Sequence, residues 1–535
     1  LSLGMLSLVD EAIDLIYDRH SYVPNLSRIN FKDQKVYDQI CSGETIGTFQ
    51  LESRAQIQMG RRIQPRDLND LAIQIAIVRP GPILGGAINM YIRKRELLRN
   101  NPDYVIRYEH PILEEFLGET LGVIVFQDQV LQICRYLAGF SDGEADSLRR
   151  SMSRKRSRQS IESYWEAFRK GCKSKKIDES VAKTIFQQIV AFSGFGFPKS
   201  HAIAFSLLAY QSAWLRHYYS TEYYVALFNN QPMGFYSLDA LSRDAKRQGI
   251  QILLPDINLS KAKCTPENSD LRIGLELVRG WGMKTAIEVI TERQRYGPFR
   301  SLSEFLQRIP HSLSRGTIEN LILVGGFKNF GLTRRELLWQ LGLWMGPRED
   351  LKPMTVRKKQ IQTELKLEDP NAAITFPELT ATEQIVMEYR MLHFSAGFHP
   401  LSFLRKKLDG KAIFSNRLCE LPNHHPVKVS GIVVARQKPS SAKGYVFISL
   451  EDEHGFINVV VNPELYKKFY SILGTEPFLV VYGHLEKSGS TLNVLASNIE
   501  RLNVHKTKKP PQETNGTFNY LEELRRFPPK SKDFS

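Results

Sequence analysis

A stretch rich in glycine and phenylalanine, FSGFGFPKSHAIAFS (192–206), contains three adjacent polar side chains that suit an anionic ligand. Lys199 can place a point charge on a phosphate, and Ser200 and His201 can donate hydrogen bonds to it. The glycines before them would let the backbone approach a ligand closely, because no Cβ intervenes. The alternative is a tight turn before a helix, with Ser200 as its N-cap. Both interpretations are compatible, since the N-terminus of a helix itself attracts anions.

The densest basic run is LRRSMSRKRSR (148–158). Planar guanidinium groups suit phosphate oxygens, which they can bind in bidentate fashion. Acidic residues flank this run only at a distance, so we expect no local ion pairing to neutralise it. The alternative is a solvated helix end. We favour a phosphate-binding role for its cations, among them Arg149, Arg150 and Lys155.

Two helix–glycine–helix units follow in tandem, LELVRGWGMKTAIEVI (275–290) and SRGTIENLILVGGFKNFG (314–331). Helix-hairpin-helix modules bind DNA at such hairpins through backbone N–H groups, which contact phosphates without reading sequence. We therefore expect DNA contacts at both hairpins and at the cations of the first. The candidate residues are Arg279, Gly280, Gly282, Lys284, Gly325 and Gly326.

Two shorter motifs carry arginines. The motif VRPGP predicts a sharp turn, in which proline keeps the preceding Arg79 out of helical geometry. The motif FQLESR places Arg54 at the start of a helix, where Ser53 or Glu52 serves the local backbone.

Two other segments have ordinary structural explanations. QLGLW (340–344) has the shape of peptides that dock on a sliding clamp, but it continues an amphipathic helix. Since such helices bury one face, we expect Leu341, Leu343 and Trp344 to be core residues. The acidic LEDEHG (450–455) is expected to be a solvated turn between strands.

The totals restrict the class of protein. A length of 535 residues predicts several domains, and a net charge of +15 with a pI near 9.4 favours a polyanionic partner, most often nucleic acid. Basicity for solubility alone is the alternative. The five cysteines are scattered, which suits a reducing compartment, and no apolar run is long enough for a membrane span. We therefore expect a cytoplasmic protein without a membrane partner.

No metal site is expected from the pattern of ligands. His424 and His425 have no cysteine or carboxylate at ligand spacing. No Asp-x-Asp pair occurs in a setting that would hold two magnesium ions.

The elements that must position these residues change character along the chain. Apolar residues at three- and four-residue spacings predict mainly helix over 35–260, and short helices separated by glycines over 273–345. A polar, proline-punctuated segment over 346–385 suits a linker, and the basic tail after 502 is expected to be mostly irregular.

After residue 425 the hydrophobic period becomes two, which predicts strands. Five strand candidates with one helical piece between the third and fourth are the layout of an OB barrel, a fold that often holds single-stranded nucleic acid. The strands are VKVSGIVVAR, YVFISLEDE, FINVVVN, FLVVYGHLE and TLNVLASNIERL, and the helix is PELYKKFYSIL. The predicted fold is therefore multi-domain and mainly α, with tandem helix-hairpin-helix units and a C-terminal OB-type β-barrel.

Several long motifs together resemble the C family of bacterial DNA polymerases, the family of the replicative polymerase III alpha subunit. They are GTFQLESR, VRPGP, VIVFQDQVLQICRYLAGFSDGEADSLRRSM, FSGFGFPKSHAIAFSLLAYQSAWLRHYY and LPDIN. The FQLESRAQ form, the opening LSLGMLS, the ending PPKSKDFS and the lack of a domain after the barrel are similar to the error-prone branch, which copies damaged templates. A replicative alpha subunit and a non-catalytic DNA-binding protein built from the same modules remain the alternatives.

The resemblance implies an organisation into six regions. They are a palm remnant (1–34), fingers (35–260), tandem helix-hairpin-helix units (261–345), a connector (346–424), the OB domain (425–502) and a basic tail (503–535). The implied partners are primer-template DNA, deoxynucleoside triphosphates, accessory translesion proteins and the sliding clamp.

The resemblance also implies roles for the candidate residues. The fingers of this family bind the incoming triphosphate with basic residues, here Arg149, Arg150, Lys155, Lys199, Ser200 and His201, with Arg79 and Arg54 at the edge of the active site. The family holds Mg²⁺ with three palm aspartates, the last of which would precede LSLGMLS. We therefore expect no catalytic residue within this chain, and no polymerisation by the chain alone.

Overall fold

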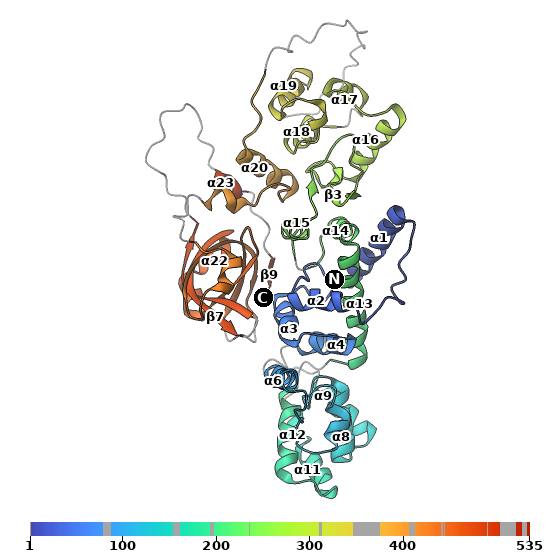
Figure 1. Cartoon of the computed structure of the whole chain (residues 1–535), viewed down its shortest axis with the longest axis vertical. Helices are drawn as coiled ribbons and strands as arrows, with labels where there is room; N and C mark the ends of the chain where they lie inside the picture. Colours follow the sequence, from blue (N-terminus) through green and yellow to red (C-terminus); the bar gives the residue numbers. More distant parts are fainter. Residues whose placement is uncertain are drawn as a thin grey trace.

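The computed structural model describes a mainly helical, multi-domain chain that ends in a β-barrel, which confirms the predicted fold class (Figure 1). A helical lobe lies at one end of the long axis, the hairpin units lie at the other, and the barrel lies beside the middle. The residues described are 2–78, 87–152, 161–192, 197–234, 236–309, 313–345, 375–405, 412–439, 442, 444–488, 491–502, 520–526 and 532–534.

The central part of the molecule is a helical base built on one hydrophobic core. Helix α13 packs against α4, and α1 packs against α14, so segments from both sides of the lobe share this core. The core also continues from the first helix into the hairpin units, across the boundaries expected at 34 and 260. Its helices are α1 (Ser2–His20), α2 (Gln34–Ser42), α3 (Arg54–Ile63), α4 (Leu68–Ile77), α6 (Ala87–Asn100), α13 (Lys199–Tyr218), α14 (Ser220–Asn229) and α15 (Leu238–Arg247).

The lobe at the end of the molecule has a second core of its own, so the predicted fingers contain two cores. Buried side chains such as Ile133, Leu137, Phe168 and Ile185 fill it. The helices are α7 (Leu113–Leu117), α8 (Gln127–Ala138), α9 (Asp142–Met152), α11 (Trp165–Ser174) and α12 (Glu179–Ala191). Both α9 and α11 pack on α8, so the basic end of α9 belongs to a helix that is held against the lobe.

The hairpin units follow a small sheet in which β3 pairs with β1 in parallel and with β2 in antiparallel fashion. Helix α18 packs against α19. The elements are β1 (Ile252–Leu253), β2 (Thr265–Glu267), β3 (Asp270–Arg272), η1 (Leu275–Leu277), α16 (Met283–Tyr296), α17 (Leu302–Arg308), α18 (Arg315–Leu323), η2 (Lys328–Phe330) and α19 (Arg334–Met345). The prediction of short helices over 273–345 is confirmed.

The predicted connector contains a helix that the sequence analysis missed, α20 (Ala381–Leu392). A capping box between Thr380 and Glu383 begins it, and its buried Ile385, Val386 and Tyr389 pack into a small core with the outer face of the barrel. The expected linker therefore ends before residue 381. Two 3-10 turns follow, η3 (Pro400–Phe403) and η5 (Ser415–Glu420).

The C-terminal part is a closed barrel, as predicted. Strand pairing runs β5-β6-β8-β7-β4, and the β4–β5 pairing closes the ring. All five expected strands and the intervening helical piece occur in order: β4 (Pro426–Gln437), β5 (Val446–Glu451), β6 (Phe456–Val461), α21 (Pro463–Lys468), α22 (Tyr470–Thr475), β7 (Phe478–Ser488) and β8 (Thr491–Arg501). In β6 the inward residues Ile457, Val459 and Val461 alternate with more exposed ones, which is the period that predicted the strand.

The described residues of the tail form two ordered elements that the sequence did not predict. Helix α23 (Tyr520–Arg526) buries Tyr520, Leu521 and Leu524 in the same small core as α20. Strand β9 (Lys532–Phe534) pairs in parallel with β4 and extends the sheet. Pairing with a strand nearly a hundred residues earlier leaves no local signal in a three-residue segment.

Candidate nucleotide and nucleic-acid interface

Helices α8 and α13 begin side by side. The segments that precede them form a parallel bridge between Phe126 and Phe197, and the N–H of Gln127 donates to the Phe197 carbonyl at 3.0 Å. The N–H of Lys199 donates to the Asp128 carboxylate of α8 at 2.7 Å. Because the N-terminus of each helix carries a partial positive charge, their common start favours an anion.

Ser200 is not the N-cap of α13. The helix starts at Lys199 after Pro198, and no side chain of the N-cap residue accepts a hydrogen bond. Asp128 from the neighbouring helix accepts from the backbone instead. The Ser200 side chain is exposed within the first turn, so its hydroxyl is available to a ligand.

The other two predicted residues also stand at the start of α13. The Lys199 ammonium lies 2.7 Å from the Glu119 carboxylate, and both side chains are partly exposed. The exposed His201 ring packs edge-on against Phe205, with centroids 4.1 Å apart. An anion that binds Lys199 must therefore compete with Glu119, an exposed partner that water screens.

Arg149 and Arg150 share one carboxylate, that of Asp146. The N–O distances are 2.8 and 2.7 Å. The hydrogen bond from Arg149 lowers the pKa of the Asp146 carboxyl. The expectation that no local acid pairs with the basic run is therefore wrong for Arg149 and Arg150, because residues three and four positions apart on a helix lie on the same face.

The structure does not join the two cationic groups directly. Helix α9, which carries Arg149 and Arg150, packs on α8, and Asp128 at the start of α8 holds the start of α13. Among the described residues, no hydrogen bond or ion pair links these arginines to Lys199. Arg79 and Lys155 lie outside the described residues. That all of these cations form one cradle stays a prediction.

Arg54 lies elsewhere, between the base and the barrel. Ser53 is the N-cap of α3, which was one of the two predicted alternatives. The Arg54 guanidinium lies 5.5 Å from the centre of the Phe456 ring in β6. Its Nε and Nη2 atoms are buried without a hydrogen-bond partner, and burial lowers its pKa to about 10. It lines a cavity of about 580 Å³ that Lys487 of the barrel also borders. The structure thus places Arg54 against the barrel rather than beside Lys199.

The first predicted hairpin is exposed and open. Gly280 and Gly282 have φ of 88° and 57°, and a Cβ added to Gly282 would meet no atom within 4 Å. The indole of Trp281 donates to the Thr317 carbonyl at 2.9 Å and fixes the hairpin on α18. Arg279, Gly280, Gly282 and Lys284 are all exposed. As at any helix start, the first N–H groups of α16 have no partner within the helix and can donate to a phosphate.

The second hairpin is packed instead. The N–H groups of Gly325 and Gly326 donate to the carbonyls of Ile322 and Leu321 at 2.9 and 2.8 Å. A Cβ on Gly326 would lie 2.3 Å from the Leu321 side chain. Contrary to the prediction, these glycines end α18 and permit close packing, so their N–H groups are not available to DNA.

Two of the three acids in the segment LEDEHG are buried, contrary to the expectation of a solvated loop. Glu451 and Asp452 have no exposed surface. Glu451 pairs with Arg243 at 2.6 Å and with Arg247 at 2.8 Å, both from α15. The available signal was the spacing of these two arginines, since residues four apart lie on the same face of a helix.

The end of α19 exposes large apolar side chains. Leu341 is buried as expected, but the predicted core residues Leu343 and Trp344 are 53% and 57% exposed. A core role was preferred for QLGLW because these side chains were expected to be buried. Their exposure removes that reason.

Neither a metal centre nor a membrane span is evident in the described part of the chain. Within it, no three His, Cys, Asp or Glu side chains are grouped so that they could hold a metal ion. None of its helices combines the length and the apolar character that crossing a membrane requires.

Three family models match the chain in the order of its structural parts. Residues 5–176 match the bacterial DNA polymerase III alpha subunit finger domain, 249–337 match a helix-hairpin-helix motif, and 427–502 match an OB-fold nucleic acid binding domain. The first match ends before α12 and covers part of the base and of the lobe, the second covers most of the hairpin units, and the third covers the barrel.

Curated relatives match almost the whole chain. Proteins named error-prone DNA polymerase from Anaeromyxobacter sp. (strain K), Mycolicibacterium paratuberculosis and Corynebacterium diphtheriae are each 35% identical to it, over 525, 507 and 503 residues. The alignments cover 94% of this chain and 44%, 45% and 46% of those proteins, so the chain spans less than half their length. The chain thus belongs to the family of the bacterial DNA polymerase III alpha subunit, in which these relatives are named error-prone DNA polymerases.

Proposed function

We propose that this chain is the nucleotide- and DNA-binding part of an error-prone DNA polymerase that copies damaged templates in the bacterial cytoplasm. The observation that carries the proposal is the common start of α8 and α13, where Ser200 and His201 are exposed and Lys199 is partly exposed on the first turn. Two helix N-termini and a lysine together favour a polyphosphate. The double substitution Arg150→Ala and Lys199→Ala in the full-length enzyme tests it.

In this proposal the deoxynucleoside triphosphate displaces Glu119 from Lys199 and accepts hydrogen bonds from Ser200 and His201. Arg149 and Arg150 add bidentate contacts from α9. The described residues do not fit the Mg²⁺ that the family uses: the carboxylates nearest to these cations, on Glu119, Asp128 and Asp146, already bind a cation or a backbone N–H and form no cluster. We therefore assign no metal ligand to this chain, and no step here depends on one.

The remaining parts would hold the primer-template DNA. The open N–H groups at the start of α16, flanked by Arg279 and Lys284, suit the duplex backbone. The barrel exposes the aromatic side chains of Tyr445 and Phe447 at β5, which suit stacking with bases of a single-stranded template. The distribution of modules supports a nucleic-acid partner along the whole chain.

We expect the double substitution Arg279→Ala and Lys284→Ala to weaken primer-template binding to the same extent on unrelated DNA sequences. Each lost phosphate contact should reduce the slope of log affinity against log salt by about 1. Fluorescence anisotropy of labelled DNA over a series of salt concentrations measures both quantities. Lys183→Ala, which removes an exposed lysine from α12, is the matched control and should change neither. An unaltered slope in the double variant would show that the hairpin does not contact phosphates.

We further propose that the exposed end of α19 docks on the sliding clamp, because QLGLW presents Leu343 and Trp344 to solvent. Truncating a buried aromatic anchor of an interface commonly costs about 2 kcal/mol or more, so Trp344→Ala should weaken clamp binding roughly 30-fold or more. Surface plasmon resonance with immobilised clamp measures the affinity. Tyr17→Ala, at a similarly exposed aromatic residue of α1, should leave it unchanged. If the unsubstituted chain does not bind the clamp, the docking role is wrong.

A further inference from the structure

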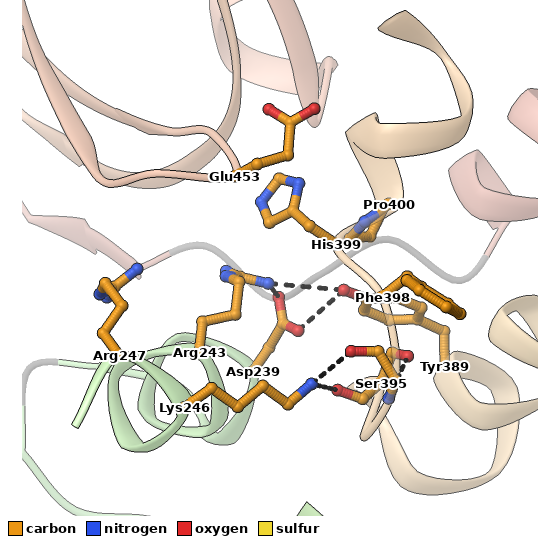
Figure 2. Close-up of a pocket in the computed structure, with 11 residues that line it drawn as sticks. Asp239, Arg243, Lys246, Arg247, Tyr389, Ser395, Phe398, His399, Pro400 and Glu453 are labelled. Atoms are coloured by element: carbon orange, nitrogen blue, oxygen red, sulfur yellow. Dashed lines mark hydrogen bonds and ion pairs between the residues drawn. The ribbon is translucent and has the colours of Figure 1, made fainter. Parts of the chain in front are cut away.

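A small cavity lies where three parts of the molecule meet, at α15, at the segment after α20 and at the turn between β5 and β6 (Figure 2). Its volume is about 270 Å³. Arg243, Lys246 and Arg247 border it from α15, and His399 lies over it from the opposite segment. None of the residues in the candidate nucleotide or hairpin sites lines this cavity.

His399 has a buried donor without an acceptor. Its Nδ1 accepts from the N–H of Leu401 at 3.2 Å, which assigns the imidazole proton to Nε2. The Nε2 atom is buried and has no hydrogen-bond partner. Burial, together with the positive charges of Arg243, Arg247, Arg405 and Lys246, lowers the pKa of His399 well below its usual value. The neutral ring therefore offers one N–H at a point where the local potential is positive.

Lys246 supplies a cation without a carboxylate partner. Its Nζ donates to the backbone carbonyls of Gly397 at 2.6 Å and Ser395 at 3.3 Å. Among the described residues it forms no ion pair. Burial lowers its pKa to about 8, although the nearby Glu388 and Asp239 carboxylates act in the opposite direction. An ammonium has three donors, so one N–H remains for a ligand.

The neighbouring arginines are already compensated by acids. Arg243 pairs with Asp239 and Glu451, and Arg247 pairs with Glu451 and Asp244. At the rim, Glu453 pairs with Arg405 at 2.9 Å. Glu388 and Asp239 offset the Lys246 charge in part without forming an ion pair with it. What remains without a direct partner is one N–H of Lys246 and the N–H of His399, and both can donate to an oxygen acceptor with a negative charge.

We propose that this cavity binds a phosphoryl group, a tetrahedral oxyanion that accepts hydrogen bonds from His399 Nε2 and Lys246 Nζ. A volume of about 270 Å³ is large enough for a phosphate or diphosphate and lies below the usual range for drug-sized ligands. The group can come from a free anion or from the backbone of single-stranded DNA beside the barrel. Because the lining residues belong to three parts of the molecule, binding would strengthen their contact. The inference does not depend on polymerase activity.

The test uses the unsubstituted 535-residue chain with histidine-selective isotope labelling. Inorganic phosphate is added at constant ionic strength, with chloride as the comparison anion. We expect a saturable shift of the His399 ring signal with phosphate and none with chloride. The signal is assigned from its loss in His399→Gln. The titration itself is made on the unsubstituted chain. It therefore remains decisive even if Lys246→Met disturbs folding.

Calorimetry then locates the binding groups. Since a hydrogen bond to a charged group is worth about tenfold or more in affinity, Lys246→Met should weaken phosphate binding by at least that factor. Lys183→Met on α12 is the control and should bind as the unsubstituted chain does. If a single-stranded oligonucleotide displaces phosphate, the natural ligand is a backbone phosphate, and if it does not, the ligand is a free anion. Absence of a saturable His399 shift with either phosphate or oligonucleotide, or unchanged binding by Lys246→Met, would overturn the proposal.

Discussion

Alanine at both Arg150 and Lys199 in the full-length enzyme should reduce kcat/KM for nucleotide incorporation by roughly 10²–10⁴-fold, because cationic contacts to a transferring triphosphate act mainly on the transition state. Lys199 stands at the common start of α8 and α13, and Arg150 is 70% exposed beside Asp146, so both can turn to a triphosphate. Single-turnover incorporation of one nucleotide measures the loss without a contribution from product release.

The same double substitution should leave the affinity of the 535-residue chain for primer-template DNA nearly unchanged. A matched control is Arg135→Ala, which removes an arginine of α8 that also pairs with one exposed aspartate, Asp142. It should incorporate nucleotides at the unsubstituted rate. If the double variant polymerises normally, the triphosphate assignment is wrong. If it loses DNA affinity instead, the cations serve the DNA and not the nucleotide.

The barrel was predictable because its signal is local. Alternation within each strand, as in Ile457, Val459 and Val461, is visible in six or seven residues and survives without knowledge of the partner strand. The tail strand Lys532–Phe534 has the same backbone conformation but is too short to show a period, and it exists because β4 offers a free edge. Helix α20 was missed because its outer face is polar and the helix follows a long polar segment, so its start is not marked by a change in composition.

In the candidate site, too, features of the local sequence were predictable and contacts with distant residues were not. Lys199, Ser200 and His201 are adjacent in sequence, so their grouping at one helix start needs no tertiary information. The carboxylates of Glu119 and Asp128 that hold Lys199 come from 80 and 71 residues away, and nothing in the local sequence marks them as its partners. The pairing of Asp146 with Arg149 and Arg150 was within reach of helix spacing alone.

The two hairpins show the limit of motif recognition. Both have paired glycines after a helical segment, and the sequence treats them alike. The two hairpins differ only in their packing. Gly282 faces open space, whereas Gly326 lies against Leu321, and its carbonyl accepts a hydrogen bond from the N–H of Ile257. The sequence does not distinguish a glycine needed for close packing from a glycine needed for access by a ligand.

The contact between α15 and the barrel depends on charge that is removed from water. Glu451 is fully buried and binds Arg243, which is also buried, and Arg247, whose side chain is 27% exposed. A buried ion pair gains little over a well-packed apolar contact, but removal of one partner leaves an uncompensated charge with its full desolvation cost. The junction should therefore be far more sensitive to loss of Glu451 than to loss of an exposed acid on the same barrel.

Glu451→Gln should destabilise the chain by about 3 kcal/mol, because the amide keeps the shape of the side chain but leaves the two arginines without its charge. Urea denaturation measures the shift, and amide hydrogen exchange along α15 and β5 shows whether the junction opens first. Glu464→Gln, at an exposed residue of α21, is the control and should change stability by less than about 0.5 kcal/mol. Equal effects of the two substitutions would mean that water reaches Glu451 and that apolar packing, rather than the ion pairs, holds the barrel against the base.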